Sequence, residues 1–309
     1  MKAQKNLVLN TGATMPSVGL GTWKSAPEEA GEAVAYALSE AGYTHVDCAA
    51  AYNNEAEIGR AFERVFKKGD VKREEIFVTS KLWNTAHKAE DVRPACEKTL
   101  RDLTLEYLDL YLMHWGMANS DSHWAIDGNG VLKLQRIPLR ETWEAMQELI
   151  GAGLVRAIGV ANFSVPMLID LTSYATIMPA VLQVELHPYL QQSRLVEFCQ
   201  YRGITVTAYS PLGSPGNYGD RGLPKLTEDP IITNIAKSHG KTSAQVLLRW
   251  GIERNTIVIP KSTHPERIRE NADVFDFVLS EKDMQEIATL DRHLRFVDPY
   301  EWGKIAYFS

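Results

Sequence analysis

The sequence predicts an α/β fold, a single (β/α)8 or TIM barrel in which eight parallel strands alternate with helices. Eight short apolar runs alternate with amphipathic segments along the chain. Several of these runs are continuous and rich in β-branched residues, which is typical of strands buried on both faces of a parallel sheet. No linker-like stretch divides the 309 residues. We therefore expect one domain over residues 1–309, a length that one barrel commonly has.

The apolar runs mark the expected strands in chain order. They cover residues 18–20, 45–48, 76–79, 108–113, 155–160, 181–185, 204–208 and 256–259. Ahead of them, residues 7–9 and 14–15 flank the triplet Asn-Thr-Gly that begins at Asn10. This pattern predicts an N-terminal β-hairpin before the first barrel strand.

The intervening segments show apolar residues at helical spacing. Ala33, Ala37 and Ala41 lie on one stripe, and Gly42 follows where a helix would end. Ser280 is placed as a helix N-cap before a stripe that begins at position 284. The other stripes cover residues 58–66, 143–150, 168–174 and 244–248.

A doubly wound parallel sheet is the alternative architecture. When such a sheet binds a dinucleotide, it usually carries a G-x-G-x-x-G turn after an early strand, and the chain contains no such motif. Three segments, 115–139, 212–229 and 291–309, are too long to be ordinary connections. Loops that follow barrel strands gather at the C-terminal face, where active sites lie. We expect the three segments there.

The composition is that of a soluble globular protein, with 45% hydrophobic residues, 23% charged residues and a net charge of −6. A mildly acidic chain without a long basic tract gives no reason to expect nucleic acid. No apolar stretch approaches the ~20 residues that span a membrane, and no signal peptide is evident. The three cysteines lie far apart. We expect a cytoplasmic, monomeric protein that acts on a small molecule.

Polar and aromatic side chains stand at or just after the predicted strands. In chain order they are Trp23, Asp47, Tyr52, Lys81, Trp83, His114, Trp115, Asn162, Gln183, Glu185, His187, Tyr209, Ser210, Lys261 and Ser262. If the barrel forms, an aspartate, a tyrosine, a lysine and a histidine from separate strands converge at one face. Titratable groups that gather in this way indicate a functional site.

Four of these side chains suit the delivery of a proton to an oxygen. A tyrosine with its ordinary pKa of about 10 is a weak proton donor at neutral pH. The cation of Lys81 would stabilise the phenolate of Tyr52 and lower its pKa, while Asp47 would keep the buried lysine charged. His114 would polarise or orient a carbonyl oxygen. Together these residues predict the acid half of a carbonyl reduction.

Each residue also has a structural interpretation. Asp47 and Lys81 are consistent with a buried ion pair, Tyr52 with an aromatic residue at a helix start, and His114 with an ordinary hydrogen-bonded histidine. Tryptophans near strand ends and in loops would line an apolar pocket or pack the loops onto the barrel. They are Trp23, Trp83, Trp115, Trp124 and Trp302. A metal-dependent hydrolase is a further class, but His45, Asp47, His114 and His187 lack the H-x-H or H-E-x-x-H spacing.

The segment IPKSTHPERIREN, residues 259–271, combines a strand end with the start of a basic helix. Lys261 and Arg267 could hold a phosphate there, together with free N–H groups of the helix start. A solvated basic helix face is the alternative explanation.

With these segments assembled, the chain resembles the aldo-keto reductase family. The matching segments are GLGTW from Gly19, HVDCAAAYNNEAEIG from His45, TSKLW from Thr79, LYLMHW from Leu110, IGVANF from Ile158, QVELHPYL from Gln183, AYSPLGSP from Ala208 and IPKSTHPERIREN from Ile259. They cover nearly the whole chain in the family order, and as a set they are highly specific.

The resemblance implies an enzyme that binds NADPH in extended form and reduces aldehydes or ketones. Tyr52 would be the general acid, tuned by Lys81 and Asp47, and His114 would orient the carbonyl. The substrate pocket would comprise Trp23, Tyr52, Trp83, His114, Trp115 and Trp302. The cofactor would contact Thr22, Trp23, Asp47, Asn162, Gln183, Tyr209, Ser210, Leu212, Ser214, Lys261, Ser262, Thr263, Arg267, Glu270 and Asn271. No metal is implied.

Three details refine this expectation. Lys261 and Arg267 at the adenosine 2′-phosphate favour NADPH over NADH. Ala161 replaces a serine that is frequent in the family, so one hydrogen bond to the carboxamide, worth about 0.5–1.5 kcal/mol, would be missing. The tail RFVDPYEWGKIAYFS is similar to those of sugar-aldehyde and xylose reductases, which suggests a sugar or another small aldehyde as substrate. A catalytically silent NADPH-binding sensor or scaffold on the same fold is the alternative.

Overall fold

The computed structural model describes residues 6–119, 125–214 and 222–308. Within them, eight strands form one sheet whose spatial order follows the order of the chain, and all neighbouring strands run parallel. The strands are β3 (Leu20–Gly21), β4 (His45–Asp47), β5 (Phe77–Leu82), β6 (Leu110–Met113), β9 (Ile158–Ala161), β10 (Val181–Glu185), β11 (Thr205–Tyr209) and β12 (Thr256–Val258). Every predicted strand is present, with ends that shift by at most three residues.

The first and last strands of this sheet meet and close it. Gly19 N donates to Val258 O at 2.9 Å, and Gly21 N donates to Pro260 O at 3.0 Å. Parallel bridges join Val18 to Val258 and Gly21 to Lys261. A doubly wound sheet would leave both edge strands apart, so that alternative is wrong and the predicted (β/α)8 barrel is confirmed.

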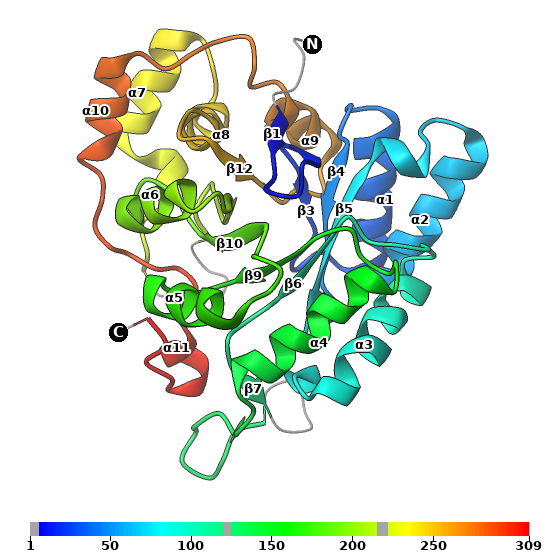
Figure 1. The fold of residues 1–309 in the computed structure, drawn as a ribbon. Coiled ribbons are helices and arrows are strands. Elements are labelled where there is room, and N and C mark those ends of the chain that lie inside the picture. Colours follow the sequence, from blue (N-terminus) through cyan, green and yellow to red (C-terminus); the bar gives the residue numbers. More distant parts are fainter. Residues whose placement is uncertain (1–5, 120–124, 215–221, 309) are drawn as a thin grey trace.

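Helices surround the strands, as Figure 1 shows. They are α1 (Pro27–Ser39), α2 (Glu55–Lys68), α3 (Ala89–Asp102), α4 (Leu139–Gly151), α5 (Val165–Tyr174), α6 (Ser193–Tyr201), α7 (Pro230–His239), α8 (Ser243–Glu253), α9 (Pro265–Ala272), α10 (Glu281–Ala288) and α11 (Pro299–Gly303). The predicted stripes lie in α1, α2, α4, α5, α8 and α10, and Ser280 caps α10 as expected by accepting from Asp283 N. Helices α3, α6 and α7 were not predicted from the sequence, although each buries apolar residues on one face.

The barrel strands separate two apolar layers. Side chains alternate across each strand, so one set packs outward against the helices and the other fills the interior. The interior set includes Phe77, Leu112 and Ile257, and Met15 from the N-terminal hairpin packs with it. That hairpin pairs β1 (Asn6–Val8) with β2 (Thr14–Pro16) in antiparallel fashion, as predicted. The hairpin therefore packs against one end of the interior.

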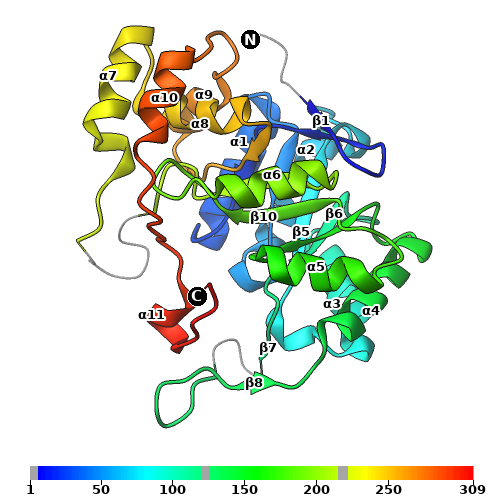
Figure 2. The same cartoon turned by 60° about the vertical axis from the view of Figure 1, so that its left-hand side comes forward.

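The opposite end of the barrel carries the long loops. Figures 1 and 2 both show β1 near the N-terminus at one end, with α11 and β7 at the other. Strand β7 (Ala118–Asn119) pairs with β8 (Leu134–Gln135) to form a small ribbon within the loop that follows β6. All three long segments contain short elements: this ribbon in 115–139, a 3₁₀ turn at Leu226–Glu228 in 212–229, and α11 in 291–309. This end is the C-terminal face of the strands, where a site was predicted.

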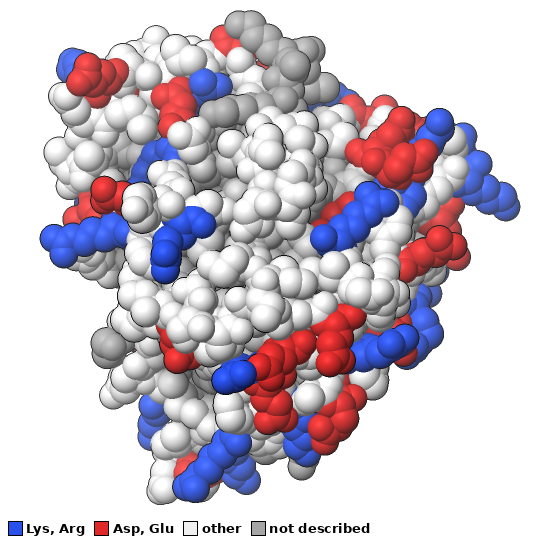
Figure 3. Space-filling model, in the orientation of Figure 1, with Lys and Arg blue, Asp and Glu red and all other residues white. Residues whose placement is uncertain are grey.

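Charges of both signs are interspersed on the molecular surface. On the face in Figure 3, Lys and Arg side chains lie among Asp and Glu around the periphery, while the middle of the face carries neither. Over the whole described surface, several charged residues form pairs one helical turn apart, such as Arg93–Glu97 and Arg140–Glu144. In the described residues, none of the helices has the length and apolarity needed to cross a membrane.

Candidate active site

The chain leaves β4 at Asp47 and reaches α2 through one short turn that carries Tyr52. Residues 50–52 form a single 3₁₀ turn, which ends where Asn53 adopts a left-handed conformation with φ of 54°. Asn54 then donates from Nδ2 to the carbonyl oxygens of Thr22 at 3.0 Å and Ser25 at 3.3 Å. These bonds fix the turn against the loop after β3. The phenol of Tyr52 is thereby held over the strand ends.

Lys81 joins Asp47 and Tyr52 into one cluster. Its Nζ donates to Asp47 Oδ1 at 2.5 Å, to Cys48 O at 2.8 Å and to the Tyr52 hydroxyl at 3.2 Å. The lysine side chain is fully buried, with 0% exposure. Its three contacts use all three ammonium N–H donors. The three predicted catalytic residues from β4, β5 and the turn after β4 are therefore in direct contact.

The charge of the buried lysine is maintained by its neighbours. Burial lowers the pKa of Lys81, but Asp47 and Tyr52 outweigh that effect and raise the pKa above its ordinary value. An ammonium in a buried site without a counter-charge would lose its proton. Lys81 is therefore a permanent cation next to the phenol.

The pKa of Tyr52 moves in the direction opposite to the one the sequence suggested. Burial raises the pKa of Tyr52 to about 12, and the opposing effect of Lys81 is smaller than the combined effects of burial and the Asp47 charge. The expected lowering is therefore wrong for the protein alone, because it considered the lysine without the loss of solvent. Tyr52 is a neutral phenol at physiological pH.

A second set of hydrogen bonds extends the cluster across the barrel. Gln183 Nε2 donates to Asp47 Oδ2 at 2.7 Å, so both carboxylate oxygens are engaged. Asn162 Nδ2 donates to His114 O at 2.9 Å, and Asn162 Oδ1 accepts from the Tyr209 hydroxyl at 2.7 Å. Asn162 adopts a left-handed conformation with φ of 63°. The ends of β4, β6, β9, β10 and β11 are thus linked by polar side chains.

His114 lies beside the phenol and against an indole. Its ring centroid is 5.8 Å from that of Tyr52 and 5.1 Å from that of Trp83, with edge-to-face geometry in both cases. Trp115 makes a similar contact with Trp302 at 6.1 Å. The polar cluster is therefore bordered by aromatic rings from distant parts of the chain.

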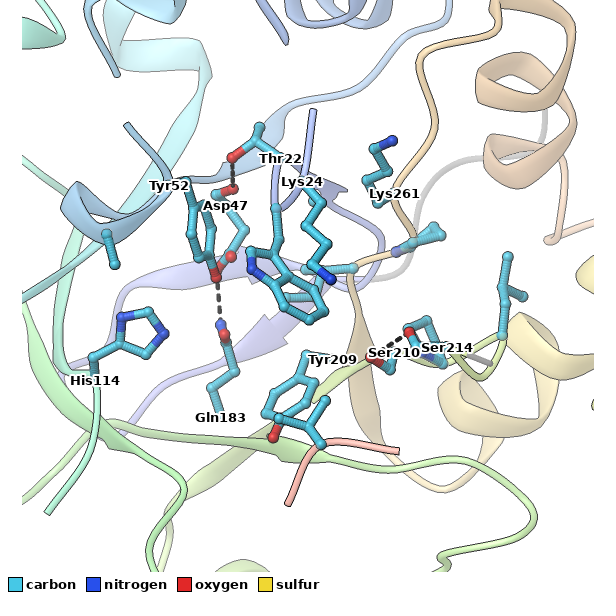
Figure 4. A pocket seen from close by; sticks show the side chains of 18 of the residues that line it. Thr22, Lys24, Asp47, Tyr52, His114, Gln183, Tyr209, Ser210, Ser214 and Lys261 are labelled. Carbon is cyan, nitrogen blue, oxygen red and sulfur yellow. Dashed lines mark hydrogen bonds between the residues drawn. The ribbon is translucent and has the colours of Figure 1, made fainter. Parts of the chain in front are cut away.

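A cavity of about 1130 Å³ opens above the cluster. Of the predicted site residues, its lining includes Thr22, Trp23, Asp47, Tyr52, Trp83, His114, Trp115, Asn162, Gln183, Tyr209, Ser210, Leu212, Ser214, Lys261, Arg267 and Trp302. Figure 4 shows Tyr52, Asp47, Gln183 and His114 toward one side, and Lys261, Ser210 and Ser214 toward the other. Lys81 lies beneath the lining. The cavity thus joins an end that carries the Tyr52 phenol to an end that carries the cations of Lys261 and Arg267.

Four predicted cofactor residues are not part of the cavity lining. They are Ser262, Thr263, Glu270 and Asn271. Ser262 and Asn271 are buried, and Glu270 accepts at Oε1 from Thr242 Oγ1 at 2.8 Å. Trp124 lies outside the described residues. These four residues follow Lys261 or flank Arg267 on α9, and those two cations do line the cavity.

Eight residues of the lining were not predicted as site residues. They are Lys24 and Val297, together with Gly21, Ala51, Pro211, Gly213, Ile259 and Pro260. Lys24 directly follows Trp23, with a left-handed φ of 55°, and burial lowers its pKa. Figure 4 shows its side chain between the two ends of the cavity. Its position after a strand-end tryptophan was a usable signal. Val297 lies in an irregular segment far along the chain, and its position had no such signal.

The fold and the site together define an oxidoreductase of the barrel type, and comparison with known proteins identifies the family. The model of the Aldo/keto reductase family matches residues 17–292. The chain therefore belongs to the aldo-keto reductase family, whose members reduce carbonyl compounds. Among the residues that the structure describes, no group of three or more His, Cys, Asp or Glu side chains is arranged to hold a metal ion.

Several characterised relatives match nearly the whole chain. It is 49% identical to aldo-keto reductase family 1 member A1 of Sus scrofa over 297 residues, which cover 95% of this chain and 91% of that protein. The Bos taurus protein of the same name is 50% identical with the same coverage. The structure of an aldose reductase from Schistosoma japonicum superposes with a TM-score of 0.91 at 43% identity, covering 98% of both chains.

Proposed function

We propose that this protein reduces aldehydes or ketones to alcohols with NADPH, and that Tyr52 delivers the proton. The contact of Lys81 with both Asp47 and the Tyr52 hydroxyl at the base of the cavity carries this proposal. The three residues supply a neutral proton donor and a permanent cation beside it. A second cationic end in the same cavity suits a phosphate-bearing cofactor.

The residues of the cavity fit NADPH. Lys24, Lys261 and Arg267 all line it, and their charges suit the phosphates of such a cofactor. Tyr209 presents a half-buried ring to the cavity, which suits stacking on the flat nicotinamide. Gly21 also lines the cavity. A Cβ at this position would lie 2.8 Å from Ile259 O, so no residue larger than glycine fits here without a shift of the backbone. When bound, NADPH would supply the hydride.

Residues of the chain itself would hold the proton and transfer it to the substrate. Tyr52 is neutral because burial raises its pKa to about 12, so it holds the proton until strong negative charge develops on the carbonyl oxygen. An alkoxide is a much stronger base than a phenolate, so transfer from the Tyr52 hydroxyl to that oxygen is downhill. Lys81 then stabilises the phenolate that remains. His114, whose ring borders Tyr52, would orient the carbonyl oxygen.

Aromatic rings form the substrate end of the cavity. Trp23, Trp83, Trp115 and Trp302 line it with Val297. This surface excludes water from the reacting centre and suits a small aldehyde with an apolar or partly hydroxylated body. A sugar aldehyde or another small aldehyde therefore remains the proposed substrate class.

A carbonyl panel tests the proposed function. The loss of NADPH absorbance would be followed with glyceraldehyde, xylose, methylglyoxal and aromatic aldehydes, and NADH would be compared in parallel. We expect turnover with NADPH and a higher Kd for NADH, because NADH has no 2′-phosphate to pair with Lys261 and Arg267. Tight NADPH binding with no turnover across the panel would instead indicate a catalytically silent sensor or scaffold.

The first prediction is that Tyr52→Phe nearly abolishes turnover. Loss of a general acid typically costs 10²–10⁴-fold, so we expect kcat to fall by about that factor. The variant retains the ring and the Asp47–Lys81 ion pair beside it, so its NADPH Kd, measured by quenching of tryptophan fluorescence, should stay within about twofold of the wild-type value. Turnover close to that of the wild type would disprove the role of Tyr52.

A further inference from the structure

Glu185, at the end of β10, holds the backbone of the C-terminal segment. It lies two residues beyond Gln183 on the same strand, and its side chain is fully buried with 0% exposure. Its Oε1 accepts from Phe296 N at 2.6 Å and lies 2.9 Å from His187 Nε2, while its Oε2 accepts from Val297 N at 3.0 Å. Two consecutive amides, more than a hundred residues away in sequence, thus share one carboxylate.

Neighbouring contacts fix the same stretch of chain. Gln192 Nε2 donates to the carbonyl oxygen of Glu185 at 2.6 Å, and Gln192 Oε1 accepts from Arg295 Nη2 at 3.3 Å. Leu294 N donates to Tyr189 O at 3.0 Å. Residues from the end of β10 to the start of α6 therefore hydrogen-bond to each part of the stretch 294–297. The Glu185 carboxylate binds the part nearest the cavity.

The stretch 294–297 leads directly into the cavity wall. Val297 lines the cavity, and the next residue, Asp298, caps α11 by accepting from Tyr300 N at 3.0 Å. Helix α11 then presents Trp302 to the same cavity. Beyond it, Gly303 O accepts from Leu132 N at 3.0 Å. The segment 298–302 is therefore an arm held at both ends, and Glu185 holds the end nearer to the barrel.

We propose that Glu185 is a positioning residue that sets the preference for bulky aldehydes by fixing where Val297 and Trp302 stand. This inference rests on the proposed carbonyl reductase function. A carboxylate has two acceptor oxygens for the two backbone N–H donors, whereas an amide has one acceptor oxygen and an NH₂ group. In Glu185→Gln the side-chain NH₂ group would face the backbone N–H of Phe296 or Val297. That backbone amide would then lose its hydrogen bond.

The decisive experiment compares two substrates in Glu185→Gln. For a bulky aromatic aldehyde that reaches Trp302, we expect kcat/KM to fall about 10-fold or more, mostly through KM, since a lost hydrogen bond to a charged group has effects of this order. For glycolaldehyde, which has only two carbons, we expect a change within about twofold. The pH profile of kcat for glycolaldehyde should be unchanged. Equal losses for both aldehydes, or none, would overturn the proposal.

Three further variants make the test specific. In a Trp302→Ala background, Glu185→Gln should have little additional effect on the ratio of the two kcat/KM values, because both changes act through one side chain. Glu185→Asp keeps the charge but shortens the reach, so it should lie between the wild type and the glutamine variant. It also carries the test if Glu185→Gln does not fold. Glu55→Gln alters another buried carboxylate, at the start of α2 and hydrogen-bonded to Ser80 of β5, and should leave the ratio unchanged.

Hydrogen exchange provides a readout that needs no turnover. In Glu185→Gln the amides of Phe296 and Val297 should exchange faster, while those of α4 should keep their protection. Faster exchange without any carbonyl reductase activity in the wild type would defeat the proposed function and leave the anchor intact. Activity with unchanged selectivity in Glu185→Gln would defeat the present inference alone.

Discussion

Strand β5 separates two buried carboxylates with opposite surroundings. On its inner face, Lys81 contacts Asp47 at 2.5 Å. On its outer face, the hydroxyl of Ser80 donates to Glu55 Oε1 at 2.5 Å. Thr99 from α3 donates to Glu55 Oε2 at 3.1 Å. Consecutive residues of one strand thus serve an ammonium–carboxylate pair inside the barrel and a carboxyl–hydroxyl cluster behind it.

The difference shows what a buried cation contributes. On the inner face, the pKa of Lys81 is raised, so its charge persists across the physiological range. On the outer face, burial raises the pKa of Glu55 to about 7, and the hydrogen bonds from Ser80 and Thr99 only partly offset that rise. Lys81 and Tyr52 therefore keep their protonation states near neutrality, whereas the packing layer behind them contains a group that titrates there.

The largest effect on stability is expected from Lys81→Met. The change leaves the Asp47 carboxylate buried without its cation, and breaking a buried pair in this way typically costs about 3–5 kcal/mol. Urea unfolding at neutral pH would measure the loss. Carbonyl reduction should also fall sharply, because the phenolate of Tyr52 loses its stabilising charge.

A surface pair is the matched control for that prediction. Lys98 and Asp102 on α3 also form a lysine–aspartate pair, but the lysine side chain is 68% exposed. Lys98→Met should therefore cost no more than about 1 kcal/mol. Adding Asp47→Asn to Lys81→Met should recover part of the lost stability, since the uncompensated charge is removed. If Lys81→Met and Lys98→Met proved equally stable, the contrast between the buried and exposed pairs would be lost.

Glu55→Gln probes the outer face through pH. The pKa of Glu55 in the folded protein is raised from 4.5 to about 7, so its stabilising contribution is complete below about pH 4.5 and is lost as the pH rises through about 7. The free energy of unfolding of the wild type, relative to Glu55→Gln, should fall by on the order of 3 kcal/mol over that range. Urea titrations of both proteins at a series of pH values would measure this difference. A difference that does not change with pH would show that Glu55 does not titrate near neutrality. Glu97→Gln, which alters a partly exposed carboxylate, serves as the control.

The sequence was sufficient to predict the site residues that stand at or near strand ends. Asp47, Lys81 and His114 each stand at or next to the end of an apolar run, so a closed barrel had to bring them together. Tyr52 was found because it follows Asp47 within one short turn. The roles of Thr263 and Glu270 came from resemblance, and the structure places neither in the cavity lining.

The features that could not be predicted from the sequence depend on packing between distant segments. The anchoring of Phe296 and Val297 by Glu185 joins residues more than a hundred positions apart, through backbone amides that carry no residue-specific signal. The pKa of Tyr52 was misjudged because its direction is a balance between burial and charge, and a sequence shows the charges without the burial.

The smallest expected effect sharpens the contrast between the two faces of β5. Because burial raises the pKa of Tyr52 to about 12, the phenol stays protonated and kcat/KM for carbonyl reduction should be flat between about pH 6 and 9. The measurement uses a neutral aldehyde, saturating NADPH and constant ionic strength. In the same buffers the stability contribution of Glu55 should still be changing. A decline in kcat/KM with a midpoint near pH 8 would show that Lys81 dominates over burial in the working enzyme, and the inner face would then titrate as the outer face does.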